Sequence, residues 1–381
     1  MSKAEKNTRF TGVLLICCAL VSLLISNTAY SGAYLHFWQA HFPIPGPTWL
    51  PVNPLGWVNE GLMSFFFLLT GLEIRKELLT GELSTPKKAW LPAIAALGGM
   101  IFPILIFFAF NTHSPDISGW GIPMTTDIAF SLGILSLAGK RVPNQLRILL
   151  TALAITDDLV AILVIAFFYS RKVNGDYLAG AALCFLFLIG LYRLRVRHLG
   201  LFVIPALILW FCLYNSGIPT AITGILVSLC LPLQMAPLLE KQLEPWVNWL
   251  ILPVFALANT AIHLPVVPGA IFSSGISLGI ICGLFIGKPL GIFLFCLAGV
   301  KLKFIHLPQQ VTWKQLLATG MIAGTGFTMS LYISALAYPE TGVLSLSKIA
   351  VILGSALSGT IGLLFLINAL PKEKKAPSSN N

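Results

Sequence analysis

Long apolar runs, separated by short polar segments, follow one another along the whole chain. Each run approaches the ~20 residues that an α-helix needs to cross the hydrocarbon core of a membrane. We expect twelve such spans, at 10–27, 60–75, 89–110, 121–138, 146–169, 177–194, 199–214, 217–234, 247–264, 275–299, 315–338 and 345–370. The pattern therefore predicts an all-α, polytopic membrane protein with about twelve transmembrane helices in a single domain, residues 1–381.

The composition agrees with this pattern. Hydrophobic residues make up 56% of the 381 residues and charged residues only 10%, with a mean hydropathy of +0.86. Soluble domains carry about 25% charged residues, so a soluble protein is excluded. The seven cysteines all fall within predicted spans, and none sits in a loop beside a partner, so we expect no disulfide framework.

The net charge of +10 reflects membrane topology and not a nucleic-acid partner. Basic residues occupy alternate loops, and twenty of the 24 lie on one side of the predicted membrane. Short loops rich in Lys and Arg stay in the cytoplasm. We therefore expect both termini to be cytoplasmic, in a protein of the inner (plasma) membrane that contacts lipid on all sides. Two ends on one side require an even number of spans, which supports twelve.

The segment 28–58 is the one long connection between predicted spans. It mixes aromatic residues, Pro and Gly, and it contains neither Lys nor Arg, which places it on the outer side. Two conformations remain open for it. The segment forms either a short hairpin that lies on the outer membrane face or an irregular interfacial loop.

Two adjacent aspartates, Asp157 and Asp158, are the strongest functional candidates. They lie in the middle of an apolar span whose only other charge is Arg147, near its start. A charge held in hydrocarbon costs at least ~2.5 kcal/mol and by default marks ion or proton handling. Neighbouring side chains on a helix point about 100° apart. One aspartate can therefore face a cavity as a cation ligand, while the other pairs with Lys288 on a different span.

One predicted span, 121–138, carries signs of an interrupted helix. Asp127 lies inside it, preceded by Pro123 and by the pair Thr125 and Thr126. Proline removes a backbone donor and disrupts the preceding turn. Threonine hydroxyls can satisfy the freed backbone groups or offer oxygen to a cation.

A second span, 315–338, is weakened by glycines on either side of Thr325, at Gly320, Gly324 and Gly326. Broken backbone at membrane depth is tolerated only where it is buried or lines a cavity. The glycines therefore favour a second interrupted helix near the site. Small residues at four-residue spacing also let helices approach closely, and this packing interpretation stays open for them.

The order of these elements predicts an internal repeat. Spans three to five contain Asp127 and the aspartate pair, and spans ten to twelve, of opposite topology, contain Lys288 and the second interrupted helix. This is the pattern of inverted repeats whose two discontinuous helices cross near the membrane midplane. Half-helix ends carry partial charges of both signs. We expect Asp127 to offset the amino ends and Lys288 the carboxyl ends.

Five motifs, in order along essentially the whole chain, resemble the NhaA-type sodium/proton antiporters. They are NEGLMSFFFLLTGLEIRKEL from Asn59, TTDIAF from Thr125, LAITDDLVAI from Leu153, GKPLGI from Gly287 and GTGFTMSLYIS from Gly324. This family is itself a known example of the inverted-repeat fold. The resemblance implies a core made of spans 3–5 and 10–12, with spans 1–2 and 8–9 on the interface side.

The resemblance also implies roles for individual residues. Asp157 and Asp158 match the family's pair that binds Na⁺ and protons, with Asp158 as the more direct ligand. Thr126 matches a residue that lines the cation site. Asp127 and Lys288 match the charges that balance the helix breaks, and Lys288 also matches the partner of Asp157.

Further residues match the family's regulatory and dimer-forming parts. Glu73, Glu77 and Glu240 match acidic residues of a cytoplasmic funnel that are associated with pH response. The segment 28–58 matches an outer-face hairpin used in homodimer contacts. The chain departs from the family at Pro219, where members carry His. The resemblance therefore implies a pH response but not the pH at which its midpoint lies.

These observations together predict a secondary transporter without a cofactor. It would exchange cytoplasmic Na⁺ or Li⁺ for external H⁺, electrogenically and in response to pH, because the same carboxylates take either a cation or protons. The alternative is another cation-coupled solute transporter. An enzyme is disfavoured because the aspartate pair lacks the third Asp of a DDxxD motif and the chain lacks the GxGD pattern of intramembrane proteases. The interrupted repeats disfavour a channel.

Overall fold

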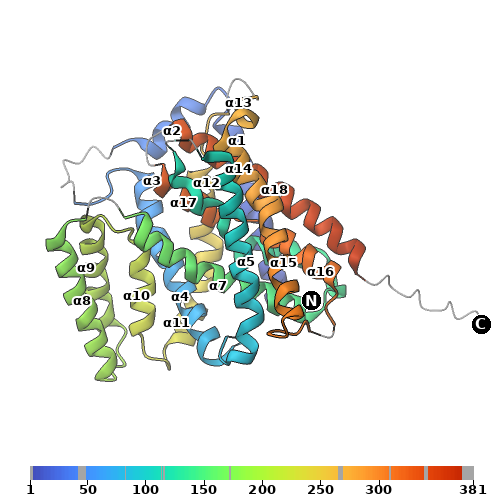
Figure 1. Ribbon diagram of the computed structural model, residues 1–381. Helices are drawn as coiled ribbons and strands as arrows, with labels where there is room; N and C mark the ends of the chain where they lie inside the picture. Colours follow the sequence, from blue (N-terminus) through green and yellow to red (C-terminus); the bar gives the residue numbers. More distant parts are fainter. Residues whose placement is uncertain are drawn as a thin grey trace, which may run out of the picture.

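The computed structural model describes residues 3–41, 49–81, 83–112, 114, 116–170, 173–264, 269–308, 310–338 and 342–370. All regular secondary structure in this part of the chain is helical, as the apolar pattern predicts (Figure 1).

The first half of the chain forms α1 (Lys3–Ile25), α2 (Ser31–Gln39), α3 (Pro54–Gly56), η1 (Trp57–Leu62), α4 (Met63–Thr80), α5 (Pro86–Asn111), η2 (Ile117–Met124), α6 (Ile128–Leu137), η3 (Gly139–Arg141), α7 (Asn144–Phe168) and α8 (Gly175–Arg193). The second half forms α9 (Gly200–Ser216), α10 (Ala221–Cys230), α11 (Ala236–Trp246), η4 (Val247–Ile251), α12 (Leu252–Asn259), α13 (Gly269–Ser273), α14 (Gly275–Cys282), η5 (Gly283–Gly287), α15 (Lys288–Lys301), α16 (Trp313–Ala323), α17 (Phe327–Ala337) and α18 (Gly342–Ala369).

Each of the twelve predicted spans overlaps one of these helices or two or three consecutive ones. Among the described residues, six helical segments are long and apolar enough to cross a membrane, or up to eight when each bent pair is counted as one span. Three further apolar helices are shorter, at Phe10–Ile25, Gly200–Ser216 and Ala221–Cys230. The chain is therefore a multi-pass membrane protein, while the count of twelve spans stays a prediction.

The long connection 28–58 differs from the hairpin considered for it. Residues Ser31–Gln39 form the helix α2, and the part 42–48 lies outside the described residues. The helix is explained by aromatic residues at four-residue spacing: Tyr34 and Trp38 fall on one face and contact each other edge-on, with ring centroids 6.2 Å apart. Trp38 is buried, so this face packs onto the protein.

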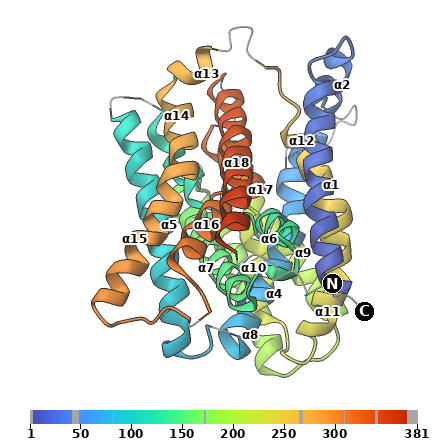
Figure 2. The same cartoon turned by 90° about the vertical axis from the view of Figure 1, so that its right-hand side faces the viewer.

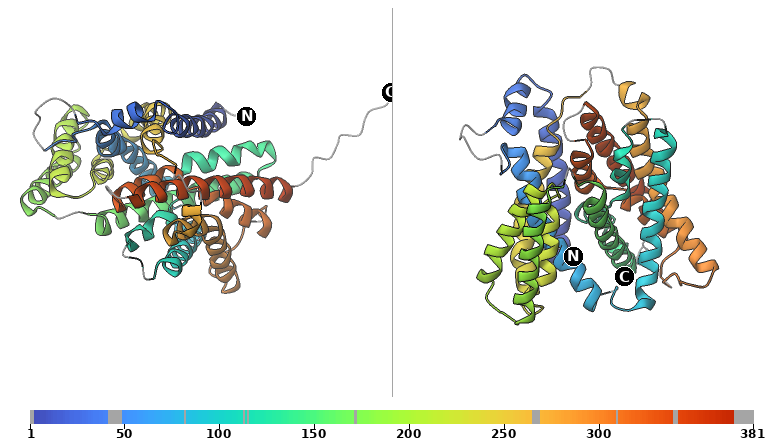
Figure 3. Two further views of the ribbon diagram at one scale, coloured as in Figure 1. Left: turned by 90° about the horizontal axis from the view of Figure 1, so that it is seen from above. Right: turned by 60° about the vertical axis from the view of Figure 1, so that its left-hand side comes forward.

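Buried side chains form two hydrophobic clusters. The smaller cluster joins α8, α9 and α10 to one face of α4, and the larger one joins most of the other helices. Figure 1 shows α8 and α9 side by side at one edge of the molecule and α15 and α16 toward the opposite edge. In Figures 2 and 3, α18 runs between the α14–α15 segment and α1. The helix α4 therefore links two packing units.

A buried arginine ties α4 to the end of α10. The side chain of Arg75 donates through Nη1 to the carbonyl oxygens of Ser228, at 2.8 Å, and Leu231. Its guanidinium also lies 5.6 Å from the ring centre of Tyr192. The last carbonyls of a helix lack partners within the helix and carry partial negative charge. Arg75 therefore closes the carboxyl end of α10.

Replacing Arg75 with methionine is expected to lower the thermal stability of the detergent-solubilised protein. Hydrogen bonds to a charged group contribute about 1.5–3 kcal/mol, and the substitution leaves two buried carbonyls without a donor. The neighbouring Lys76→Met is a matched control, because Lys76 is 61% exposed and an exposed ion pair contributes at most about 1 kcal/mol. Equal melting temperatures for the two variants would contradict the role of Arg75.

Candidate cation-binding site

Two interrupted helices meet in the interior of the molecule. Between η2 and α6 the chain is extended over three residues, 125–127, and the helix direction changes by 41°. Between α16 and α17 it is interrupted at 324–326, with a bend of 44°. These are the two spans in which the sequence predicts a break. Thr125 and Thr325 lie in the breaks, and both are completely buried.

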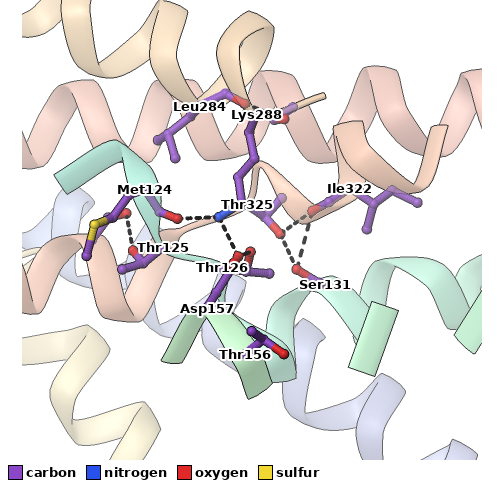
Figure 4. A network of polar contacts seen from close by, with 12 residues as sticks. Met124, Thr125, Thr126, Ser131, Thr156, Asp157, Leu284, Lys288, Ile322 and Thr325 are labelled. Atoms are coloured by element: carbon purple, nitrogen blue, oxygen red, sulfur yellow. Dashed lines mark hydrogen bonds and ion pairs between the residues drawn. The ribbon is translucent and has the colours of Figure 1, made fainter. Parts of the chain in front are cut away.

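Backbone and hydroxyl contacts join the two breaks directly. The backbone N–H of Asp127 donates to the carbonyl of Thr325 at 2.8 Å. The hydroxyls of Ser131 and Thr325 lie 2.7 Å apart, and those of Thr125 and Ser330 lie 3.0 Å apart. Figure 4 shows Ser131 and Thr325 directed toward each other, with Thr125 lying apart from them beside Met124. Some of the freed backbone groups are therefore satisfied by the opposite interrupted helix.

Close packing explains two of the glycines at the second break. A Cβ atom at Gly324 would collide with the carbonyl oxygen of Leu284 and the hydroxyl of Ser358. A Cβ atom at Gly326 would collide with the hydroxyl of Ser330. Both interpretations of these glycines therefore apply, since they lie at a helix break and also allow a close approach of neighbouring segments.

Asp127 receives hydrogen bonds from the amino ends of both half-helices. Its Oδ1 accepts from the backbone N–H of Phe130 in α6 at 2.9 Å. Its Oδ2 accepts from the N–H of Thr328 in α17, at 2.9 Å, and from the Thr328 hydroxyl, at 2.6 Å. A carboxylate is favourable beside the positive end of a helix dipole. The structure thus places Asp127 where the charge argument expects it.

Lys288 reaches the carboxyl end of only one half-helix. Its Nζ donates to the carbonyl of Met124, the last residue of η2, at 2.6 Å, and forms an ion pair with Asp157 Oδ2 at 2.7 Å (Figure 4). Both side chains of the pair are fully buried. Lys288 directly follows the π-helix η5, an irregularity that is frequent at functional sites. Thr126 completes this group by donating to the same Asp157 oxygen at 2.6 Å.

The carboxyl end of the other half-helix, α16, is satisfied by hydroxyl groups. Thr325 donates to the carbonyl of Ile322 at 2.7 Å, and Ser358 of α18 donates to that of Met321 at 2.6 Å. Ser131 contributes a longer contact to Ile322. Lys288 thus contacts only the η2 end directly, and its expected compensation of both carboxyl ends stays a prediction. The sequence reasoning missed Ser131 and Ser358, although a serine inside an apolar span is a signal that could have found them.

Asp158 faces a cavity, whereas Asp157 faces Lys288. The cavity has a volume of about 290 Å³ and is bordered by α1, α4, α6, α7, α11, η4, α12 and α17. Asp158 is almost fully buried and has no hydrogen-bond partner for its Oδ1 among the described residues. The 100° between neighbouring side chains produces this division of the pair. Asp127 and Thr328 also line the cavity.

The three predicted funnel residues, Glu73, Glu77 and Glu240, line the same cavity. Two residues that were not predicted, Lys76 and Glu244, join them there. Lys76 and Glu240 form an ion pair at 2.7 Å, and Lys76 is mostly exposed, which places this pair at the mouth of the cavity. The structure therefore connects Asp158 to a rim of carboxyl groups.

Comparison with known protein families covers nearly the whole chain, including all of the site residues described above. The family described as Na+/H+ antiporter 1 matches residues 2–366 of the chain. The chain belongs to the Na+/H+ antiporter 1 family. This membership confirms the resemblance drawn from the five motifs, and it places the chain among transporters instead of enzymes.

Individual members of the Na+/H+ antiporter 1 family match over nearly their whole length. A protein of Albidiferax ferrireducens named Na(+)/H(+) antiporter NhaA is 45% identical over 368 residues, which cover 93% of this chain and 94% of that protein. Na(+)/H(+) antiporter NhaA 2 of Flavobacterium johnsoniae is 44% identical over 369 residues, 93% of this chain and 89% of that protein. Na(+)/H(+) antiporter NhaA 1 of Klebsiella pneumoniae is 42% identical over 366 residues, 93% of each.

Proposed function

We propose that this chain exchanges Na⁺ or Li⁺ for H⁺ and that Asp158 is the group for which they compete. The observation that carries the proposal is the division of the aspartate pair. Each aspartate has an Oδ1 without a hydrogen-bond partner among the described residues, but only Asp158 lines the cavity, whereas Asp157 is paired with Lys288. Sodium and lithium ions need oxygen ligands, and a carboxylate gives up its proton when it binds one of them.

The neighbours of Asp158 have distinct roles in this proposal. Asp157 supplies a second carboxylate and forms the ion pair with Lys288. The arrival of a cation can therefore shift the proton that Asp157 and Lys288 share. Thr126 orients Asp157 through its hydrogen bond. Asp127 holds the two half-helices in place, with Thr125, Gly324, Thr325 and Gly326 forming the breaks. More protons than cations per cycle would make the exchange electrogenic.

The orientation in the membrane follows from the loop charges. Both termini are cytoplasmic in this proposal, and the cavity opens to the cytoplasm, so that cytoplasmic Na⁺ leaves as external H⁺ enters. Glu73, Glu77 and Glu240 at the cavity serve the response to pH. The interrupted helices cross at the midplane between inverted repeats. Two copies associate as a homodimer through the outer segment 28–58.

The experiment that tests this function measures proton movement in inside-out vesicles from cells without other antiporters. After respiration has acidified the vesicle interior, addition of Na⁺ or Li⁺ is expected to release the quenching of a pH-sensitive dye, whereas choline is not. The measurement is repeated from mildly acidic to alkaline pH. No response to any monovalent cation, with the protein present in the membrane, would refute exchange. Solute-dependent Na⁺ uptake would instead favour the alternative, a solute symporter.

A further inference from the structure

A second lysine, Lys348, lies buried in α18 away from the aspartate pair. Only 5% of its surface is exposed. Its Nζ donates to Asn259 Oδ1 at 3.2 Å, and it forms no ion pair with a carboxylate among the described residues. Burying an amine without a carboxylate is costly. A chain that carries such a lysine uses it or tolerates a substantial loss of stability.

Asn259 extends this contact to a third helical segment. Its Nδ2 donates to Asn59 Oδ1 at 2.8 Å and to the carbonyl of Phe255 at 3.2 Å. Lys348 belongs to α18, Asn259 to the end of α12 and Asn59 to η1. We refer to these three side chains as the polar latch. The polar latch joins α18, part of the expected repeat core, to two segments of the expected interface side.

A layer of aromatic rings lies beside the polar latch. Tyr332 of α17 packs between Phe67 of α4 and Phe255 of α12, with ring centroids 5.6 Å and 6.5 Å from its own. All three side chains are buried. The Tyr332 hydroxyl has no hydrogen-bond partner among the described residues. The aromatic layer also brings together residues of the core and of the interface side.

The continuous helix η1–α4 gives the order of these layers. Asn59, Met63 and Phe67 are spaced by four residues and lie on one face, and Glu73 lies further on, at the cavity. With a rise of 1.5 Å per residue, Asn59 lies about 21 Å from Glu73 along the axis. The sequence of layers is therefore polar latch, aromatic layer and cavity. In Figure 1, α12 and α17 lie nearer to α13 than α11 does, and α11 borders the cavity mouth. The first residue of α12, Leu252, and the amino end of α17 reach the cavity, whereas Asn259 lies at the other end of α12.

We propose that the polar latch holds the outer half of the cation path closed while the Asp158 cavity is open, and that its Lys348–Asn259 contact breaks in each transport cycle. This inference rests on the proposed exchange, because a shared site must open alternately to the two sides. Opening toward the outside requires the core to move relative to the interface side. The hydrogen bond between α18 and α12 spans that boundary, and the aromatic layer beneath it excludes water.

Two substitutions are expected to change the latch in opposite directions. Lys348→Met keeps the length of the side chain but removes the donor, which favours the outward-open state. Asn259→Asp gives Lys348 a carboxylate partner, and the Asn59 amide can turn to donate to it, which favours the closed state. A buried ion pair in which both partners are satisfied is held more tightly than the contact of an ammonium group with a neutral amide. Lys348→Arg, which keeps the donor and the charge, is the matched control.

The readout is the reaction of a thiol placed between the latch and the aromatic layer. All native cysteines are replaced, and Met63, which is completely buried, is changed to Cys. A membrane-impermeant maleimide is then added from outside to intact cells. Relative to the otherwise unchanged chain, Lys348→Met is expected to raise the labelling rate about tenfold, the factor that 1.4 kcal/mol of a lost hydrogen bond produces. Asn259→Asp is expected to lower it, and Lys348→Arg to leave it nearly unchanged.

The opposite directions separate a latch from general loosening. A structure that is merely destabilised would label faster with Asn259→Asp as well, and this result would overturn the proposal. Unchanged labelling with Lys348→Met would also overturn it. The exchange proposal is tested independently of the latch, because labelling by the maleimide does not require transport. If the wild type exchanges no cation but the two variants still label in opposite directions, the exchange proposal fails and the latch stands.

Discussion

Replacing Asp158 with asparagine is expected to abolish cation/proton exchange while the protein still inserts and folds. Asparagine has nearly the same shape, but it cannot carry the exchanged proton or offer a negatively charged oxygen to Na⁺. Removal of a group that transfers a proton typically lowers a rate by about 10²–10⁴-fold. We therefore expect at least a ~100-fold lower rate of Na⁺-dependent dye dequenching in inside-out vesicles. Because the side chain faces the cavity and has no described partner, its loss costs little stability.

The matched control is Asp176→Asn, the same chemical change at an exposed aspartate in the first turn of α8. It is expected to exchange at the wild-type rate. Both variants are compared with the wild type for the amount of protein in the membrane and for melting temperature in detergent. Exchange by Asp158→Asn at the wild-type rate and apparent affinity would refute the assignment of this residue as the shared site.

Lys288→Met is expected to have the largest effect on stability. The substitution leaves Asp157 buried without its partner and the carbonyl of Met124 without a donor. Breaking a buried ion pair by removing one partner costs about 3–5 kcal/mol. The melting temperature of the solubilised protein should therefore fall well below that of the wild type. Exchange should be impaired as well, because Lys288 no longer holds Asp157 in place beside Asp158.

The double variant Asp157→Asn/Lys288→Met decides whether the loss arises from the pair. With both charges gone, no uncompensated charge remains in the interior, and most of the lost stability should return. Asp157→Asn alone leaves Lys288 unpaired and should resemble Lys288→Met. Additive losses of stability in the double variant would show that the two side chains act independently, against the 2.7 Å contact between them.

The local chemistry of the site was predictable from the sequence because it depends on few charges in an apolar chain. Asp127, Asp157, Asp158 and Lys288 are the ionisable residues deep within predicted spans, so few pairings were possible. The angle between successive helical residues then separated the two aspartates. Helix breaks were predictable for a similar reason, since Pro123 and the glycines near Thr325 are poor helix formers at membrane depth.

Other features depend on contacts between distant residues and leave little trace in the sequence. Ser358 and Lys348 both belong to α18, and nothing near them indicates that one caps α16 and the other contacts Asn259 of α12. The helix α2 was missed because proline and glycine elsewhere in the segment 28–58 favoured irregular backbone. The π-helices η1, η4 and η5 were not predicted either, since they are set by packing of the whole helix and not by composition.

The rim of the cavity has a consequence for how fast ions arrive. Several carboxyl groups and one lysine line the cavity, at Glu73, Glu77, Glu240, Glu244, Asp158 and Lys76. Such an excess of negative charge in a low-dielectric cleft concentrates cations near its opening and repels anions. Dissolved salt screens this attraction, with a Debye length of about 8 Å at physiological ionic strength. Capture of Na⁺ from the solution should therefore slow as ionic strength rises, even when the sodium concentration is constant.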